Sequence, residues 1–330
     1  MTPIIGNPVA QAAFLDAIGG GNLHHAWLIA GPEGVGKMRF ARAAALRLLA
    51  EAADPGAFGS TLDVPPGHRM SALFAAGSHP DYRELRRLPK EEDKPEGELA
   101  RSIPVKQIRA FLPMLSTKPA LSQRRVIVID AIDDLEKGGA NALLKSLEEP
   151  PSGTIFLLVS HAPGRLLPTI RSRCRLLRFD RLDDVDVARV LRSQLPEADE
   201  DEIAVLVRAG AGSPGRALHF AGLDLGGLET ELAAIAADGD PTNARRVRLA
   251  KALGAKSAQT RYEAFLDRAP AFIAERAPAL QGARLKEALD AYDVAREVAR
   301  AALANSLDAT TSVFEMAGLV ARLAERRPSL

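Results

Sequence analysis

A glycine-rich turn between a short apolar run and a helical segment constrains the fold of this chain more than any other feature. The apolar run Ala26–Ala30 (AWLIA) is followed by GPEGVGKM, and a helical pattern begins there. Glycines let a backbone wrap closely around phosphates, and the N–H groups at a helix start are donors for an anion. We therefore predict a phosphate-binding loop rather than an unrelated glycine turn that happens to end in lysine. Its predicted nucleotide-binding residues are Gly31, Gly34, Gly36 and Lys37.

The first half of the chain alternates strand and helix patterns. Continuous apolar runs, which are typical of buried strands, occur at Ala26–Ala30, Val126–Asp130 and Thr154–Ser160, with weaker runs at Tyr82–Arg87 and Arg175–Phe179. Helical patterns lie between them, roughly at Lys37–Ala50, Pro104–Leu115 and Ala140–Glu149. Strands that alternate with helices indicate a parallel sheet covered on both faces. We predict an α/β domain of the phosphate-loop NTPase type with a five-stranded parallel sheet.

The second half of the chain is predicted to be helical. A chain of 330 residues is too long for one ordinary domain. Three short helices are expected at Asp183–Leu195, Asp199–Ala209 and Pro214–Phe220, and long amphipathic helices at Thr260–Glu275, Leu280–Leu307 and Thr311–Arg326. We therefore expect an α/β domain over 1–179, a small helical lid over 180–225 and an all-α collar, used for oligomerisation, over 226–330.

Two stretches are predicted to be irregular. Residues 89–101 (PKEEDKPEGELAR) contain almost nothing to bury, so we expect a mobile surface loop there. Residues 54–66, rich in glycine and proline, form a second predicted insertion.

The phosphate loop lacks the groups that hydrolysis needs. The motif calls for Ser or Thr after the lysine to hold magnesium, but Met38 stands there, and a thioether is a poor ligand for that hard ion. Asp130 ends the strand VIVID, where an acid that holds magnesium is expected, yet the next residue is Ala131, which cannot activate water. Asp133 is the remaining candidate acid, although a turn-capping role suits it better. We predict no intrinsic ATP hydrolysis, while binding of ATP or ADP without hydrolysis stays open.

Several longer motifs resemble the clamp-loader subunits of bacterial DNA polymerase III, in their order and spacing. The motifs are LHHAWLIAGPEGVGK at 23–37, SHPDY at 78–82, RVIVIDAID at 125–133, NALLKSLEEPP at 141–151, RSRC at 171–174 and GSPGRAL at 212–218. The resemblance implies an AAA+ fold. Within that family, the delta-prime kind lacks the magnesium-binding hydroxyl and the catalytic acid. In this chain Met38 and Ala131 stand at the positions of these two groups.

The resemblance also assigns roles to two arginines. In the RSRC motif it implies that Arg173 is an arginine finger, which stabilises charge on the transferred phosphate in the ATP site of a neighbouring subunit. Without the motif, Arg173 would be interpreted as a solvated or ion-paired strand end. Arg216 lies where AAA+ lids carry a nucleotide-sensing arginine, and its alternative role is to tie the lid to the first domain.

Zinc is not expected. Many relatives carry a zinc module of clustered cysteines before SHPDY, but Cys174 is the only cysteine of this chain. His68 and His79 alone cannot complete a tetrahedral site, so they are expected to be surface or hydrogen-bonding residues. Cys174 itself is expected to be a small packed residue rather than a nucleophile.

The resemblance implies a function in DNA replication. It implies a subunit without enzymatic activity of its own in the DNA polymerase III holoenzyme, a DNA-directed DNA polymerase. Its partners would be gamma/tau-type motor subunits and a delta subunit in a hetero-pentameric ring, the sliding clamp, and primer–template DNA. The candidate DNA contacts are Lys106, Arg109 and Lys118, for which an ordinary solvated charge is the alternative.

Two other functions compete with this one. The chain could be a catalytically active AAA+ ATPase, such as a motor subunit or a helicase-loading switch, or a DNA-binding adaptor outside any ring. The 43 basic and 42 acidic residues nearly cancel, so no strong basic field marks a dedicated nucleic-acid binder. No signal peptide or apolar run of about 20 residues occurs, so no membrane association and a cytoplasmic, replisome-associated protein are expected.

Overall fold

The computed structural model describes residues 3–21, 23–90, 97, 99–305 and 307–324. The chain forms two compact units, one made of Met1–Gln194 with Gly210–Arg216, the other of Leu195–Ala209 with Ala217–Leu330. The division at residues 180 and 226 expected above stays a prediction.

The first unit contains the predicted five-stranded parallel sheet. Its strands are β1 (Ala26–Ala30), β2 (Tyr82–Arg86), β3 (Arg125–Asp130), β4 (Thr154–Ser160) and β5 (Arg175–Arg178). Their order across the sheet is β2-β3-β4-β1-β5, and all four pairings are parallel. All residues of β1 and β4 are buried, which explains the continuous apolar sequence of β1 and of the interior of β4. This confirms the predicted fold class.

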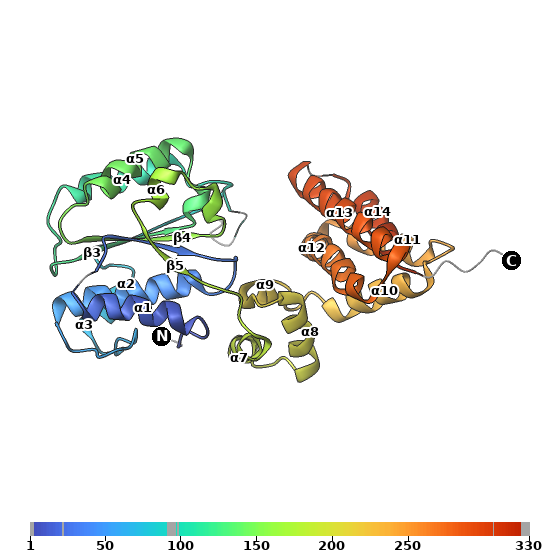
Figure 1. Cartoon of the computed structure of the whole chain (residues 1–330), viewed down its shortest axis with the longest axis horizontal. Coiled ribbons are helices and arrows are strands. Elements are labelled where there is room, and N and C mark those ends of the chain that lie inside the picture. The colour runs from blue at the N-terminus through green and yellow to red at the C-terminus, as the bar shows by residue number, and fades with distance from the viewer. Residues whose placement is uncertain (1–2, 22, 91–96, 98, 306, 325–330) are drawn as a thin grey trace. The chain divides into compact units, whose positions relative to one another are not determined.

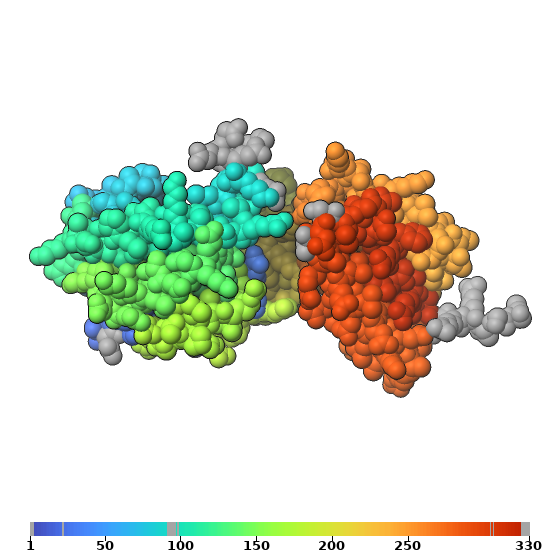
Figure 2. All heavy atoms as spheres, turned by 90° about the horizontal axis from the view of Figure 1, so that it is seen from above, coloured from blue at the N-terminus to red at the C-terminus, as the bar shows by residue number. Residues whose placement is uncertain are grey.

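Helices cover both faces of this sheet (Figure 1). The helices α1 (Pro8–Gly19), α2 (Lys37–Ala53) and α3 (Arg69–Ala75) lie on one face, and α4 (Val105–Leu115), α5 (Lys137–Glu148) and α6 (Pro168–Arg171) lie on the other. In Figure 2 the second layer forms a continuous teal-to-lime surface. The sequence patterns did not predict α1 and α3. In α1, only one side is buried, and its alanines give little contrast between the two sides.

The helix α5 begins three residues before its predicted start. Gly138 and Gly139 disfavour a helix by propensity, which hid its first turn. Tertiary packing explains the glycines, because a Cβ on Gly139 would lie only 3.3 Å from the Ile108 side chain in α4. The absence of a side chain therefore lets α4 and α5 approach closely.

The predicted insertion at 54–66 has no helix or strand and is held by a buried arginine. Arg47 in α2 is only 3% exposed. Its guanidinium donates to the carbonyl oxygens of Thr61 at 3.0 Å and Gly59 at 3.1 Å, and it forms an ion pair with Glu51. A single cationic side chain thus ties the insertion to α2.

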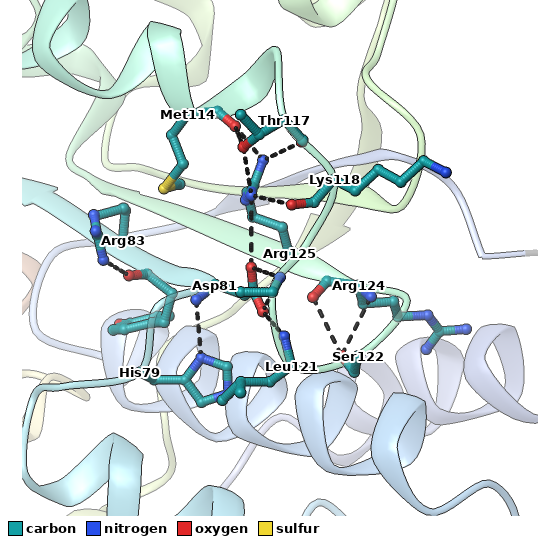
Figure 3. A network of polar contacts seen from close by, with 12 residues as sticks. His79, Asp81, Arg83, Met114, Thr117, Lys118, Leu121, Ser122, Arg124 and Arg125 are labelled. Carbon is teal, nitrogen blue, oxygen red and sulfur yellow. Dashed lines mark hydrogen bonds and ion pairs between the residues drawn. The ribbon is translucent and has the colours of Figure 1, made fainter.

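A second buried arginine organises the loop before β3 (Figure 3). Arg125 donates to the carbonyl oxygens of Met114, Thr117 and Lys118, and it lies 3.5 Å from the fully buried Asp81 carboxylate. Asp81 also accepts the backbone N–H groups of Ala120 and Leu121. Since Asp81 precedes β2 and Arg125 begins β3, this network fixes the amino-terminal edge of the sheet.

The rest of the described chain is helical. Its helices are α7 (Asp184–Gln194), α8 (Glu200–Gly210), α9 (Pro214–His219), α10 (Leu225–Asp238), α11 (Ala244–Leu253), α12 (Gln259–Arg276), α13 (Gly282–Asn305) and α14 (Ala309–Ala321). Short 3-10 helices occur at Ile132–Asp134, Pro163–Arg165, Lys256–Ala258 and Ala277–Ala279. The helices α10 to α14 pack as a bundle, within which buried Arg268 of α12 bridges Glu229 of α10 and Glu275.

The predicted loop at 89–101 falls largely outside the described residues, which exclude 91–96 and 98. Pro89 and Leu99 at its ends form an antiparallel bridge. None of the helices in the described part of the chain is both long and apolar enough to cross a membrane.

Candidate functional site

The glycine-rich turn has the backbone conformation that only glycine adopts easily. Gly34 and Gly36 have φ angles of +76° and +95°, and Gly36 directly precedes the first residue of α2. Gly31 is required for another reason, since a Cβ there would lie 2.0 Å from the carbonyl oxygen of Phe179. The loop after β1 therefore has the strand–turn–helix setting of a phosphate-binding loop.

Lys37 is folded back onto this loop. Its side chain is buried, 2% exposed, and its ammonium donates to the carbonyl oxygens of Gly31, at 2.6 Å, and Pro32. Burial lowers the pKa of Lys37 to about 8, and the negative charge of Asp130 opposes this shift. The lysine thus already has acceptors within its own loop.

A second turn lies directly on the phosphate loop. This lid turn, residues 212–216, comes from the GSPGRAL motif. The backbone N–H of Gly215 donates to the carbonyl of Gly34 at 2.9 Å, and the Ser213 hydroxyl donates to the carbonyl of Glu33 at 2.8 Å. A Cβ on Gly34 would lie 2.3 Å from the Ser213 hydroxyl oxygen and 3.0 Å from the Arg216 backbone nitrogen. The backbone of the predicted residue Arg216 therefore lies next to the phosphate loop.

Asp130 and Asp133 form the acidic side of the site. Asp130 ends β3 at the same edge of the sheet as the phosphate loop, and burial raises the pKa of its carboxyl. Asp133 is committed elsewhere, because it accepts from the Ser160 hydroxyl at 2.9 Å and from the backbone N–H groups of His161 and Ala162. Ala131 is buried and adds no polar group. The site thus joins a phosphate loop to Asp130, while the Asp133 carboxylate is held by hydrogen bonds from the residues around the end of β4.

Arg173 lies at the opposite edge of the sheet. It precedes β5, whose first residue Arg175 pairs with Trp27 near the start of β1, whereas the phosphate loop follows the end of β1. The guanidinium of Arg173 forms an ion pair with Glu148 at 2.7 Å and donates to the carbonyl of Thr169 at 2.8 Å. The structure therefore brings together the predicted nucleotide-binding residues but places the predicted finger apart from them.

The candidate DNA contacts do not form one cluster. Lys106 and Arg109 are exposed on the first turns of α4, while Lys118 follows the carboxyl end of that helix. The backbone carbonyl of Lys118 belongs to the Arg125 network, and its exposed side chain points away from it (Figure 3). Glu136 accepts the Val105 backbone N–H at the start of α4, so a carboxylate of the chain itself occupies that helix terminus.

The contacts of His68, His79 and Cys174 indicate structural roles for these residues. Among the described residues, no cluster of three or more His, Cys, Asp or Glu side chains could hold a metal. His79 is buried and accepts the backbone N–H of Asp81 at 3.1 Å, and His68 contacts Asp54 at 2.8 Å. Burial raises the pKa of the Cys174 thiol to about 12, so the reactive thiolate is disfavoured at neutral pH.

Sequence reasoning missed three residues that matter here. It did not identify Glu148 as the partner of Arg173, and it gave no role to Ser213 or Gly215. No local sequence pattern indicates that the GSPGRAL turn contacts Glu33 and Gly34, because the two turns are about 180 residues apart in the sequence.

Comparisons with known proteins find similarity to subunits of DNA polymerase III. The family model described as DNA polymerase III, delta subunit, matches residues 6–183. DNA polymerase III subunit delta' of Pseudomonas aeruginosa is 36% identical over 205 residues, 62% of this chain and 58% of that protein. The subunit delta' of Escherichia coli is 32% identical over 204 residues, 60% of this chain and 54% of that protein.

This chain therefore spans less than two thirds of the length of these relatives. A solved structure of a DNA polymerase III gamma subunit-related protein from Thermotoga maritima is similar with a TM-score of 0.45 and 17% identity, over 94% of this chain and 98% of that one.

Proposed function

Because the chain belongs to the DNA polymerase III delta subunit family, we propose that it is a clamp-loader subunit of the delta-prime kind. In this proposal the chain does not hydrolyse ATP itself. It supplies Arg173 to the ATP site of an adjacent gamma/tau-type motor subunit, within a ring that also contains a delta subunit. The ring opens a sliding clamp and places it on primer–template DNA.

The observation that carries this proposal is the position of Arg173. Own-site catalysis would need Arg173 near the phosphate loop, but the length of β1 separates them. Five residues of strand at about 3.3 Å each span roughly 16 Å, which exceeds the reach of an arginine side chain. Arg173 is one-third exposed, so a phosphate on another molecule can approach it. An arginine finger supplied in trans fits both facts.

The degenerate site supports the absence of hydrolysis. Met38 offers no oxygen to magnesium, Ala131 offers no base, and Asp133 is occupied by three hydrogen bonds. The lid turn also contacts the loop directly, at Gly34. We propose that any ATP or ADP bound through Gly31, Gly34, Gly36 and Lys37 stays intact, and that neither zinc nor another cofactor is used.

The test is a reconstituted loader that contains Arg173→Ala. Removing the finger should lower ATP hydrolysis stimulated by clamp and primed DNA about a thousandfold at the site that it serves. Arg171→Ala, two residues away and also exposed, is the matched control and should leave the rate unchanged. Unchanged stimulated hydrolysis in the Arg173 variant would remove the finger from the proposal.

The competing function is that of an active AAA+ motor. ATP turnover by the purified chain alone distinguishes the two, since turnover at the rate of ordinary AAA+ ATPases contradicts a non-hydrolysing subunit. A DNA-binding adaptor differs in assembly, because it should not co-purify in a stoichiometric pentamer with motor and delta subunits.

A further inference from the structure

The guanidinium of Arg173 is held by two acceptors and keeps most of its donors. Nη2 contacts Glu148 Oε1 at 2.7 Å, and Nη1 donates to the carbonyl oxygen of Thr169 at 2.8 Å. An arginine side chain carries five N–H donors in a planar fork. These two contacts therefore fix the direction of the fork and leave about three donors for another ligand.

Both partners of this contact are attached to the core of the first unit. Leu147, next to Glu148, is 1% exposed, and His25 Nε2 donates to its carbonyl oxygen at 3.0 Å. On the other side, the backbone N–H of Arg173 donates to Ile170, which is also 1% exposed in the same core. The last turn of α5 and the turn that follows α6 are therefore both fixed, and the ion pair joins two rigid points.

The Arg173 and Glu148 side chains are also exposed enough for a phosphate on another molecule to reach the guanidinium. The Arg173 and Glu148 side chains are 33% and 46% exposed. Exposed ion pairs contribute little to stability, so a phosphate dianion can bind the same guanidinium without a large competing cost. A free arginine side chain, in contrast, loses much rotamer entropy when it is immobilised. A weak contact that holds the side chain beforehand removes part of that loss.

We propose that Glu148, at the end of the LLKSLEEPP helix, is a positioning residue for Arg173. It holds the guanidinium in the orientation from which the arginine reaches a neighbouring subunit's nucleotide. This inference rests on the proposed function of Arg173. It assigns to Glu148 an action through Arg173 only, since Glu148 itself touches no substrate.

The experiment uses reconstituted loader with single variants of this subunit, and it measures ATP hydrolysis stimulated by clamp and primed DNA. Glu148→Ala should lower kcat about three- to fivefold with an unchanged KM for ATP, which corresponds to about 1 kcal/mol. Glu148→Gln keeps an oxygen acceptor and should stay within about twofold of the unaltered subunit. Glu149→Ala is the matched control, because Glu149 directly follows the end of α5 and its side chain is also exposed.

A double variant separates positioning from a general structural effect. In the background of Arg173→Ala, the further change Glu148→Ala should lower the rate no more, since its target is already absent. A further loss there, a rate in Glu148→Ala equal to or above that of the unaltered subunit, or a Glu148→Gln variant as slow as Glu148→Ala would each overturn the inference. These outcomes leave the arginine finger intact, whereas an unaffected Arg173→Ala loader defeats the proposed function itself.

Discussion

The backbone N–H of Gly215 lies 2.9 Å from the carbonyl oxygen of Gly34, so two glycine turns far apart in the sequence are in direct backbone contact. Each glycine leaves room for the other, because a Cβ on Gly215 would lie 2.7 Å from the Gly34 Cα. The phosphate loop of this chain is thus also a docking surface for its own lid turn.

This contact predicts that alanine substitution lowers the free energy of unfolding by different amounts at Gly34 and Gly36. Gly34→Ala places an L residue at φ +76° and its Cβ 2.3 Å from the Ser213 hydroxyl oxygen, whereas a Cβ on Gly36, at φ +95°, meets nothing within 4 Å. We expect Gly34→Ala to lower the free energy of unfolding by about 3 kcal/mol and Gly36→Ala by about 1–2 kcal/mol. Denaturant unfolding measures both, and equal losses would contradict the packing between the turns.

The buried pair of Asp81 and Arg125 predicts a large stability effect. Asp81→Ala would leave a buried guanidinium without its carboxylate and the backbone N–H groups of Ala120 and Leu121 without an acceptor. We expect the free energy of unfolding to fall by about 3–5 kcal/mol. The exposed Asp63→Ala is the control and should change it by less than about 0.5 kcal/mol. A small loss in the Asp81 variant would show that the network is not coupled to folding.

Lys37 predicts a stability that rises with pH. Burial lowers its pKa to about 8 in the folded protein, from the ordinary 10.5, so the unfolded chain binds more protons between these values. The free energy of unfolding should therefore increase from pH 8 to 10 relative to that of Lys37→Met, which lacks the titrating group. Chemical denaturation of both proteins across this range provides the measurement, and a pH-independent difference would show that Lys37 titrates normally.

The hydrogen bonds of Arg47 predict that this side chain, and not a metal ion, holds the 54–66 segment in the folded protein. Its guanidinium holds the 54–66 segment through the carbonyl oxygens of Gly59 and Thr61. We expect Arg47→Met to lower the free energy of unfolding by about 2–4 kcal/mol, since the two partly buried hydrogen bonds from its charged guanidinium to Gly59 and Thr61 are lost. Addition of EDTA should leave the melting temperature of the unaltered protein unchanged. A clear fall with EDTA, restored by zinc, would reveal a metal site.

Much of the fold follows from local patterns. The runs AWLIA, VIVID and TIFLLVS are apolar except for terminal residues of the last two, because both faces of their strands are covered, and burial of this kind is visible in the sequence alone. The boundaries of α2 and α4 were predicted to within a few residues for a similar reason. Helices with mostly small side chains, such as α1, were missed because alanine marks buried and exposed positions equally.

The sequence by itself determined that the phosphate loop is followed by Met38 and that Asp130 is followed by Ala131, since these are facts of adjacent residues. Only the tertiary structure decided that Gly215 contacts Gly34 and that Asp133 accepts hydrogen bonds from Ser160 at the end of β4 and from the two residues after it. The same holds for the ion pair of Arg173 with Glu148 at the far edge of the sheet. These contacts join segments that are distant in the sequence. Their partners are selected by strand order and helix packing, which a local pattern of burial does not encode.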